Sequence, residues 1–254
     1  MTLNTAQELE KLQAIGRIVA MVREAMGVAI LPGMSTRELD AIGARLLNEA
    51  GARSAPQLSY GFPGATCISV NHHVAHGIPD GTRLQSGDLV NIDVSAEKDG
   101  FFADTGASFT VGKASQSRAR LCQAGKKILQ LAIQQVRAGR PLNRLGWSLQ
   151  REARRRGYTL IQNLGSHGVG RALHEEPSFI APYPDPNDKR VLAEGMVITL
   201  EPFVSTGATE VFQLRDGWTL ATEARYDTVQ YEHTLVVTRA EPIIVTSLDA
   251  RASA

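Results

Sequence analysis

Residues 88–112 read DLVNIDVSAEKDGFFADTGASFTVG, and this stretch decides the fold class. Valine, isoleucine and phenylalanine alternate with other residues on both sides of Lys98-Asp99-Gly100, a good turn sequence. We therefore predict two antiparallel strands joined as a hairpin. Asp93 and Asp104 lie equally far from a four-residue loop at residues 97–100. If the hairpin closes there, the two aspartates are cross-strand partners on one face of the sheet.

The two aspartates are unusual in this setting. Facing carboxylates repel each other by roughly 1 kcal/mol or more even at a high effective dielectric, and strand interiors are poor places for aspartate. Both costs vanish if the pair binds a cation. The alternative is a different register that turns one aspartate toward solvent, and the hairpin alone leaves both interpretations open.

Predicted helices come in pairs on either side of the hairpin. Thr5-Ala6-Gln7-Glu8 and Ser35-Thr36-Arg37-Glu38 have the form of capping boxes. The first opens an amphipathic helix that ends near residue 31, before Pro32-Gly33, and the second opens a helix that ends near residue 51. Two further helices are expected at about residues 117–138 and 143–156.

Strand-like segments follow the second helix pair, at residues 158–164, 196–203, 206–220 and 228–238. The order of helix pair, strands, helix pair and strands indicates an α+β fold with two halves of similar design, at about residues 1–112 and 113–248. We expect residues 1–254 to form a single domain, in which only the tail at residues 249–254 looks disordered.

The composition is ordinary for a globular protein, with 43% hydrophobic and 21% charged residues among 254. A chain of this length buries about 70–75% of its unfolded surface, so a core can form without disulfides. The formal net charge of +1 gives no strong field that would recruit nucleic acid or an anionic membrane. Cys67 and Cys122 are no disulfide framework and suit a reducing cytosol.

Neither a signal sequence nor a membrane span is expected. The first residues, MTLNTAQELEKLQ, are polar, and no uncharged apolar run approaches the roughly 18 residues that a span needs. We therefore expect a soluble, cytoplasmic protein. The predicted helix at residues 143–156 carries Arg151, Arg154, Arg155 and Arg156. These arginines fit either RNA contact or, more commonly, a solvated face that also suits the helix dipole.

All six histidines fall within three short segments, residues 71–79, 166–177 and 230–234. Scattered structural histidines would not normally cluster in this way, so the clustering is the first sign of a functional site. In the first segment His72 and His76 are four residues apart, as in the zincin pattern H-E-x-x-H. We set a zincin aside, because His73 stands where the catalytic glutamate would be and the following glycine and proline prevent a helix.

Further candidates lie in the second half of the chain. Residues 166–177, SHGVGRALHEEP, place His167 and His174 on either side of glycines that permit close approach of a ligand. Glu201 and Glu232 stand in otherwise apolar strand segments. A buried carboxylate there costs several kcal/mol unless it is paired or metal-bound. Each glutamate alone fits a surface residue as well as a ligand.

Together these segments supply four carboxylates, Asp93, Asp104, Glu201 and Glu232, and the imidazole of His167. The set is too rich in oxygen for a structural zinc site, which prefers thiolates and histidines. It fits two divalent transition ions about 3.5–4 Å apart, bridged by carboxylates, which deprotonate a shared water near neutral pH. The sequence therefore predicts metal-assisted hydrolysis.

Five motifs, in this order, resemble those of the type I methionine aminopeptidases over about residues 6–245. They are HGIP from His76, NIDV with Asp104-Thr105, HGVG with HEEP from His167 to Pro177, Glu201-Pro202, and YEHT around Glu232. The resemblance implies the pita-bread fold, an α+β structure in which two pseudo-symmetric halves, with antiparallel sheet covered by helices, enclose a central site.

The resemblance also implies a role for each candidate. Asp104 and Glu232 would bridge two divalent ions (Co, Mn, Fe or Zn), Asp93 would chelate one ion, and His167 with Glu201 would hold the other. Glu201 would act as the general base. His76 would contact the scissile amide nitrogen and His174 the carbonyl oxygen, where negative charge develops; the alternative for both histidines is a structural hydrogen bond.

The implied side-chain pocket differs from that of relatives at two positions. Phe62, Cys67 and Trp218 fit the family's pattern for this pocket. Ser59 and Leu173 stand where relatives often have a tyrosine and a phenylalanine, and His72 replaces a common acidic residue. The lost rings predict a roomier or differently shaped pocket, although Leu173 could still pack against a thioether.

The expected function is removal of the initiator methionine from peptides and nascent chains whose second residue is small. A broader or Xaa-Pro-directed aminopeptidase on the same fold is the alternative among hydrolases, and a non-catalytic binding protein is the alternative from another class. We expect a monomer with no membrane partner and no specific nucleic acid, and a transient ribosome contact stays open.

Overall fold

The computed structural model describes residues 1–248, so the tail predicted to be disordered lies outside the described residues. Both predicted capping boxes are confirmed: Thr5 and Glu8 cap the first helix, and Ser35 and Glu38 cap the second. A short helix that the sequence did not predict follows them, stopped by Gly61 in the left-handed conformation. The helices are α1 (Ala6–Ala29), α2 (Thr36–Glu49), α3 (Ala55–Tyr60), α4 (Gln116–Ile133) and α5 (Asn143–Arg155).

The predicted hairpin is confirmed as β4 (Leu89–Lys98) and β5 (Phe101–Thr110). Its register differs from the expected one, because the strands are joined by the two-residue turn Asp99-Gly100, in which both residues have positive φ. Asp93 therefore pairs with Gly106, and Asp104 pairs with Ser95. The expected direct pairing of the two aspartates is wrong. Side chains alternate with a period of two, so this two-residue shift still leaves both aspartates on the same face.

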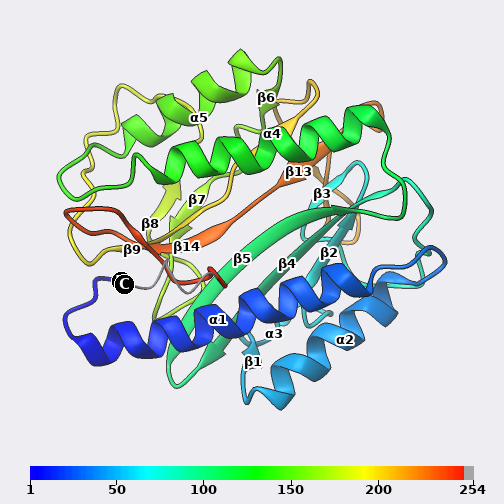
Figure 1. The fold of residues 1–254 in the computed structure, drawn as a ribbon, viewed down its shortest axis with the longest axis horizontal. Helices are drawn as coiled ribbons and strands as arrows, with labels where there is room; N and C mark the ends of the chain where they lie inside the picture. The colour runs from blue at the N-terminus through cyan, green and yellow to red at the C-terminus, as the bar shows by residue number, and fades with distance from the viewer. Residues whose placement is uncertain (249–254) are drawn as a thin grey trace.

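The hairpin is the centre of the first half of the molecule. β1 (Arg53–Ser54) and β2 (Cys67–Val70) pair with successive parts of β4, and β5 pairs with β4 along its whole length. Helix α1 packs across the hairpin, and the two share one hydrophobic core with α2 (Figure 1). The fully buried members of this core include Leu12, Ile15, Val19, Met26, Leu39, Val90, Ile92 and Val94.

The second half is built on a five-stranded antiparallel sheet, beside which α4 and α5 lie (Figure 1). Leu121, Ile128 and Leu145 of the two helices share a second core with Ile198 and Leu235 of this sheet. The strand order is β15 (Ile243–Ile244), β14 (His233–Val236), β9 (Val197–Leu200), β7 (Ser166–Gly168) and β8 (Glu175–Ile180).

Two three-stranded sheets complete the described part of the fold. One contains β13 (Thr228–Gln230), β10 (Phe203–Ser205) and β6 (Thr159–Leu160), and the other contains β11 (Phe212–Gln213), β12 (Leu220–Ala221) and β3 (His73–Ala75). The second of these sheets joins the two halves, because β3 pairs with β12. The division into two pseudo-symmetric halves of one domain stays a prediction.

Several predicted strands are shorter than expected, and the interruptions fall at functional candidates. The segment 196–203 is split into β9 and β10 at Glu201-Pro202, where proline lacks the N–H that a ladder needs. The segment 228–238 is split into β13 and β14 at Tyr231-Glu232. The segment 206–220 is mostly loop, and α4 ends at Ile133, earlier than expected. The two glutamates therefore lie between strands and not within them.

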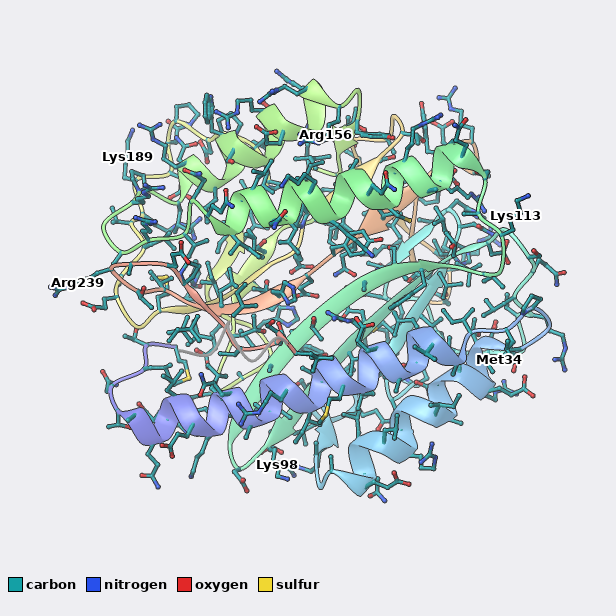
Figure 2. All side chains as sticks on the ribbon, viewed as in Figure 1. Met34, Lys98, Lys113, Arg156, Lys189 and Arg239 are labelled. Atoms are coloured by element: carbon teal, nitrogen blue, oxygen red, sulfur yellow. The ribbon has the colours of Figure 1, made fainter. Side chains whose placement is uncertain are left out.

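The side chains of Lys113, Lys189 and Arg239 lie at the periphery of the molecule (Figure 2). Three of the four arginines near the end of α5 contact the buried Glu152, so intrahelical pairing explains them: Arg151 at 3.0 Å, Arg155 at 3.5 Å and Arg156 at 2.6 Å. Within residues 1–248, no helix has the length and apolar character needed to cross a membrane.

Candidate metal centre

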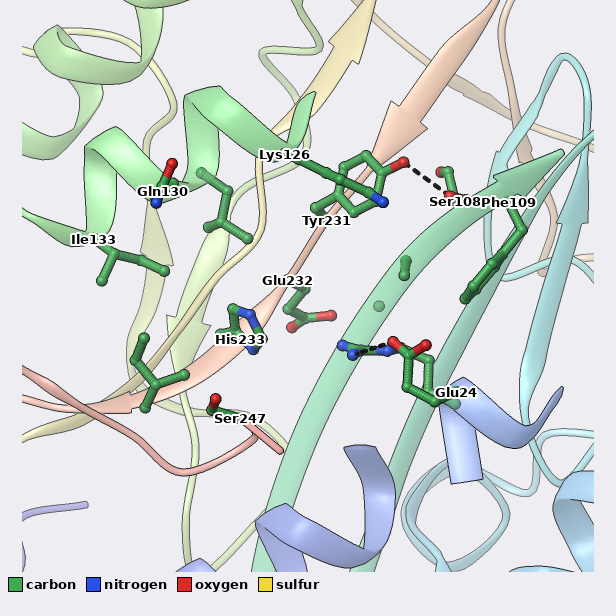
Figure 3. A pocket seen from close by; sticks show the side chains of 15 residues that line it. Glu24, Ser108, Phe109, Lys126, Gln130, Ile133, Tyr231, Glu232, His233 and Ser247 are labelled. Carbon is green, nitrogen blue, oxygen red and sulfur yellow. Dashed lines mark hydrogen bonds and ion pairs between the residues drawn. The ribbon is translucent and has the colours of Figure 1, made fainter. Parts of the chain in front are cut away.

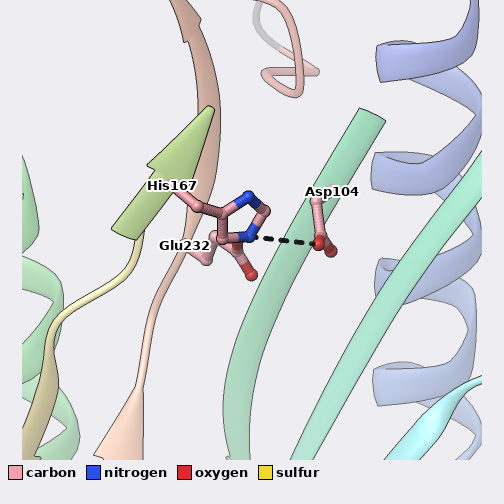
Figure 4. Close-up of side chains that lie close together, drawn as sticks. All are labelled: Asp104, His167 and Glu232. Atoms are coloured by element: carbon pink, nitrogen blue, oxygen red, sulfur yellow. Dashed lines mark ion pairs between the residues drawn. The ribbon is translucent and has the colours of Figure 1, made fainter. Parts of the chain in front are cut away.

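Three of the five predicted ligands lie close together at the centre of the molecule. One ligand atom of each of Asp104 on β5, His167 on β7 and Glu232 between β13 and β14 lies within 4.8 Å of the others (Figure 4). His167 Nε2 is 4.0 Å from Asp104 Oδ2 and 3.4 Å from Glu201 Oε1. The fold thus brings carboxylates from distant segments around one imidazole.

Gln230 joins the remaining carboxylates to this cluster. Its side-chain Nε2 has two hydrogens to donate, lies 3.3 Å from Asp93 Oδ2 and 3.2 Å from Glu232 Oε2, and is 3.5 Å from Glu201 Oε2. Asn91 Nδ2 donates to Gln230 Oε1 at 2.8 Å and so orients the amide. Sequence analysis missed Gln230, although it stands two residues before Glu232 and therefore on the same side of an extended segment.

Two threonines tie the segments of Asp104 and Glu232 to each other. Thr234 Oγ1 donates to the Asp104 carbonyl at 2.8 Å and accepts from the Asp104 N–H at 3.0 Å. Thr105 Oγ1 donates to the Glu232 carbonyl at 2.9 Å. All three hydrogen bonds are buried, so the two carboxylates are carried on backbone that has little freedom to move.

His167 is held as a neutral imidazole. Its Nδ1 lies 2.8 Å from the Gly168 carbonyl, which can only accept, so Nδ1 carries the proton and Nε2 presents a lone pair to the cluster. Burial, followed by the neighbouring His174, lowers the pKa of His167 to about 3. The imidazole is therefore uncharged at neutral pH, as metal coordination requires.

The protein itself supplies few groups that offset the negative charge of these buried carboxylates. Burial and then the charge of Asp93 raise the pKa of Asp104 and of Glu201 well above their usual range, and burial and then Asp104 do the same for Glu232. Asp104 Oδ1 and Glu232 Oε1 are buried and lack a hydrogen-bond partner within residues 1–248. Unpartnered carboxylate oxygens beside a neutral imidazole nitrogen are suitable ligands for a divalent cation.

An open cavity of about 260 Å³ leads to the cluster. Four of the five predicted pocket residues line it, namely Phe62, Cys67, Leu173 and Trp218. The rings of Phe62 and Trp218 meet edge to face with centroids 5.2 Å apart. Burial, then Asp93, raises the pKa of the Cys67 thiol well above its ordinary value, so Cys67 is a protonated wall residue and no nucleophile.

The fifth predicted pocket residue, Ser59, is not among the residues that line this cavity. It is exposed on α3, and the next residue, Tyr60, lines the cavity. Consecutive side chains of a helix point in directions about 100° apart, so Ser59 and Tyr60 of α3 face different surroundings. A tyrosine ring is therefore present at the cavity after all, one position later than expected.

His76 and His174 both line the cavity beside the carboxylates. The ring of His174 lies 4.1 Å from that of His167, and its Nδ1 is 2.6 Å from the Tyr60 hydroxyl. His76 adopts a left-handed φ of 53°, which is uncommon for histidine. Both rings are open to the cavity, yet surrounding protein lowers the pKa of each through desolvation. His72 and His73 line a different cavity.

Buried carboxylates around a neutral imidazole, open to a largely apolar cavity, are the arrangement of a metal-dependent hydrolase. The comparisons agree with this class. Residues 10–239 match the model of metallopeptidase family M24, and the chain belongs to this family.

Named relatives refine the comparison. The chain is 49% identical over 249 residues to methionine aminopeptidase 2 of Bacillus subtilis, covering 98% of this chain and all of the relative. The solved methionine aminopeptidase of Rickettsia prowazekii is 32% identical, with a TM-score of 0.92 over 97% of this chain and all of that one. The predicted resemblance to methionine aminopeptidases is confirmed, and with it the pita-bread fold.

A more distant likeness concerns the fold alone. The prolidase of Pyrococcus furiosus is 23% identical, with a TM-score of 0.77, and 98% of this chain covers 66% of that one. The same fold therefore occurs in peptidases whose names refer to different substrates.

Proposed function

We propose that this protein is a methionine aminopeptidase, which removes the N-terminal methionine from peptides and nascent chains with a small second residue. The observation that carries the proposal is the position of the largely apolar cavity, which opens directly on the buried carboxylates. The relatives named as methionine aminopeptidases support it. A cytoplasmic location and a monomeric state are part of the same proposal.

Two divalent ions, Co, Mn, Fe or Zn, would be held by the five candidate ligands. In this assignment the ligand atoms would come from the carboxylates of Asp93, Asp104, Glu201 and Glu232 and from the imidazole of His167. When bound, such ions supply Lewis acidity and lower the pKa of a coordinated water toward neutrality. The donor set supports divalent transition ions, because it combines carboxylate oxygens with a single neutral imidazole nitrogen.

Glu201 is the proposed general base. It follows β9 immediately before Pro202, its Oε1 accepts from Thr199 Oγ1 at 3.1 Å, and it lines the cavity that a substrate would enter. A proton taken from the attacking water would pass to Glu201 and then to the leaving amine. His76, on the same cavity wall, is placed to contact the scissile amide nitrogen.

His174 is the proposed donor to the substrate carbonyl oxygen. Burial, then Asp104, raises the pKa of the Tyr60 phenol, so Tyr60 stays protonated and can donate to His174 Nδ1. That hydrogen bond leaves the ring proton on Nε2, where it can stabilise the negative charge that develops on the carbonyl oxygen. Tyr60 is thus a positioning residue for His174.

The apolar wall would select the side chain of the first residue. Phe62, Leu173 and Trp218 present carbon surface to the cavity, and Cys67 presents a protonated thiol. An unbranched thioether fits an irregular apolar cavity of this kind, and its sulfur packs favourably against aromatic edges. A proline-directed site would instead have to recognise the second residue.

Hydrolysis of Met-Ala, Leu-Ala and Ala-Pro peptides by the protein supplied with Mn²⁺ or Co²⁺ tests the proposal. We expect Met-Ala to be cleaved with the highest kcat/KM. Preferred cleavage of Ala-Pro would contradict the proposal and favour the Xaa-Pro alternative. A protein that binds divalent metal but cleaves none of the three would favour a non-catalytic role.

A further inference from the structure

A second cavity, of about 350 Å³, lies between α1 and α4 (Figure 3). Arg23 and Glu24 of α1 line one side, and Lys126 and Gln130 of α4 line another. Glu232 and His233 also line this cavity, which is separate from the proposed substrate cavity. Its walls are partly apolar, with Phe109, Leu129, Ile133 and Ile244.

Arg23 is a buried cation whose partners are incomplete. The residue is 8% exposed. Its Nη1 donates to Thr105 Oγ1 and its Nη2 donates to Glu24 at 2.9 Å, but its buried Nε has no hydrogen-bond partner within the described chain. Glu24 is 46% exposed, so water screens its charge. A buried guanidinium is costly unless all its donors are satisfied, and within the described residues the Nε of Arg23 has no acceptor.

Lys126 brings a second positive charge to the same cavity. Figure 3 shows Lys126 reaching from α4 across the ring of Tyr231, and its Nζ lies 5.4 Å from the ring centroid. The Gln130 amide and the Ser108 hydroxyl also line the cavity. The lining is therefore rich in hydrogen-bond donors, and its two carboxylates are the partly exposed Glu24 and the buried Glu232.

We propose that the cavity between α1 and α4 binds a small oxyanion, held by Arg23 and Lys126. A tetrahedral or carboxylate oxyanion would give the unpartnered Nε of Arg23 an acceptor and would pair with the ammonium of Lys126. Since Glu24 already accepts from Nη2, the anion would accept from Nε. The apolar walls would exclude a large hydrated ion.

The site would be linked to the metal centre by two hydrogen bonds. Arg23 Nη1 donates to Thr105 Oγ1, which donates to the carbonyl of Glu232. The same guanidinium would therefore contact the bound anion and the residue that fixes Glu232. The proposal does not depend on the aminopeptidase assignment, because binding can be measured without any substrate.

Sulfate is the probe, titrated by calorimetry into the metal-loaded protein at constant ionic strength set with chloride. We expect saturable binding to the wild type, at least about tenfold weaker binding to Lys126→Gln, and none to Arg23→Met. Lys126 is exposed, so its variant should fold even if Arg23→Met does not. Lys113→Gln removes the same charge at an exposed position outside the cavity and should bind like the wild type.

Crystals soaked in selenate, which scatters anomalously, locate the ion. A peak between Arg23 and Lys126 is the expected result. No saturable sulfate binding, equal binding to the wild type and Lys126→Gln, or a selenate peak only at the carboxylate cluster would each overturn the proposal.

Discussion

Gln230 is the residue whose amide contacts, and so orients, the carboxylates of the candidate metal centre. Its amide reaches Asp93 and Glu232 and, at the limit of hydrogen bonding, Glu201, while Asn91 fixes its orientation. Outer partners of metal ligands of this kind typically change metal affinity or activity by about 10–100-fold when they are replaced. Gln230 therefore matters to the centre without being a ligand itself.

Gln230→Met keeps the volume of the side chain and removes its donors. We expect divalent metal to bind about 10–100-fold more weakly, because Asp93 and Glu232 lose the group that orients them. Calorimetric titration of Mn²⁺ into metal-free protein measures this change. Gln162→Met, at an exposed position, is the matched control and should bind like the wild type. Equal affinity of the two variants would remove Gln230 from this role.

Tyr60→Phe removes the hydroxyl that contacts His174 Nδ1 and leaves the ring in place. We expect kcat on a methionyl peptide to fall about threefold to tenfold. A rate change of this size corresponds to the loss of one partly exposed hydrogen bond worth about 1 kcal/mol. KM should change little, because the phenyl ring still lines the cavity. Tyr158→Phe, which lies outside the cavity, controls for the loss of a hydroxyl. An unchanged kcat would show that Tyr60 does not position His174.

At the scale of elements, the hairpin shows what patterning can and cannot predict. Alternation of apolar residues identified β4 and β5, and the period of two placed Asp93 and Asp104 on one face despite the wrong turn length. Residue spacing alone could not distinguish a two-residue from a four-residue turn. The interruptions at Glu201 and Glu232 depend on tertiary pairing between distant strands, which the local sequence does not specify.

Gly106 lies opposite Asp93 in this hairpin, directly beneath Gln230. A Cβ at this position would lie 2.3 Å from Gln230 Oε1, so Gly106→Ala must displace the amide. We expect weaker Mn²⁺ binding and a free energy of unfolding lower by about 1–3 kcal/mol, the usual cost of overpacking. Denaturant unfolding and metal titration measure these effects. Gly81→Ala, where a Cβ meets nothing within 4 Å, should change neither, and an equal response would refute the close packing.

Helix α5 provides a test that is independent of the metal. Side-chain hydrogen bonds lower the pKa of Glu152 below its ordinary value, and the bond from Arg156 contributes most. A lowered folded-state pKa stabilises the protein above the ordinary glutamate pKa, and this contribution is lost as the pH falls through the folded value. Glu152→Gln should therefore reduce the free energy of unfolding by about 1 kcal/mol at pH 7, after allowance for solvent screening of the arginines.

The difference between wild type and Glu152→Gln should disappear when the pH falls below the folded pKa of Glu152. Denaturant unfolding at a series of pH values measures it. Glu210→Gln, an exposed control, should show no such difference. A penalty for Glu152→Gln that is equally large in acid would mean that the charge of Glu152 contributes nothing.

At the scale of the molecule, the candidate centre forms only because both halves of the sequence contribute residues to it. The first half supplies Asp93 and Asp104, and the second supplies His167, Glu201 and Glu232. The chemical types and order of these residues made a metal-dependent hydrolase predictable from the sequence. Gln230, Tyr60 and the pair of threonines were not predictable, because their roles arise from contacts between segments more than 100 residues apart.

The central claim is that this cluster binds divalent ions and that their binding permits release of an N-terminal methionine. The most direct measurement is to titrate Mn²⁺ into metal-free protein while following methionine released from a Met-Ala-Ser peptide. The account predicts no release in the presence of a chelator, and release that rises with added metal and saturates when two ions are bound per chain. Full release from protein stripped of metal, or no release at any metal content, would contradict it.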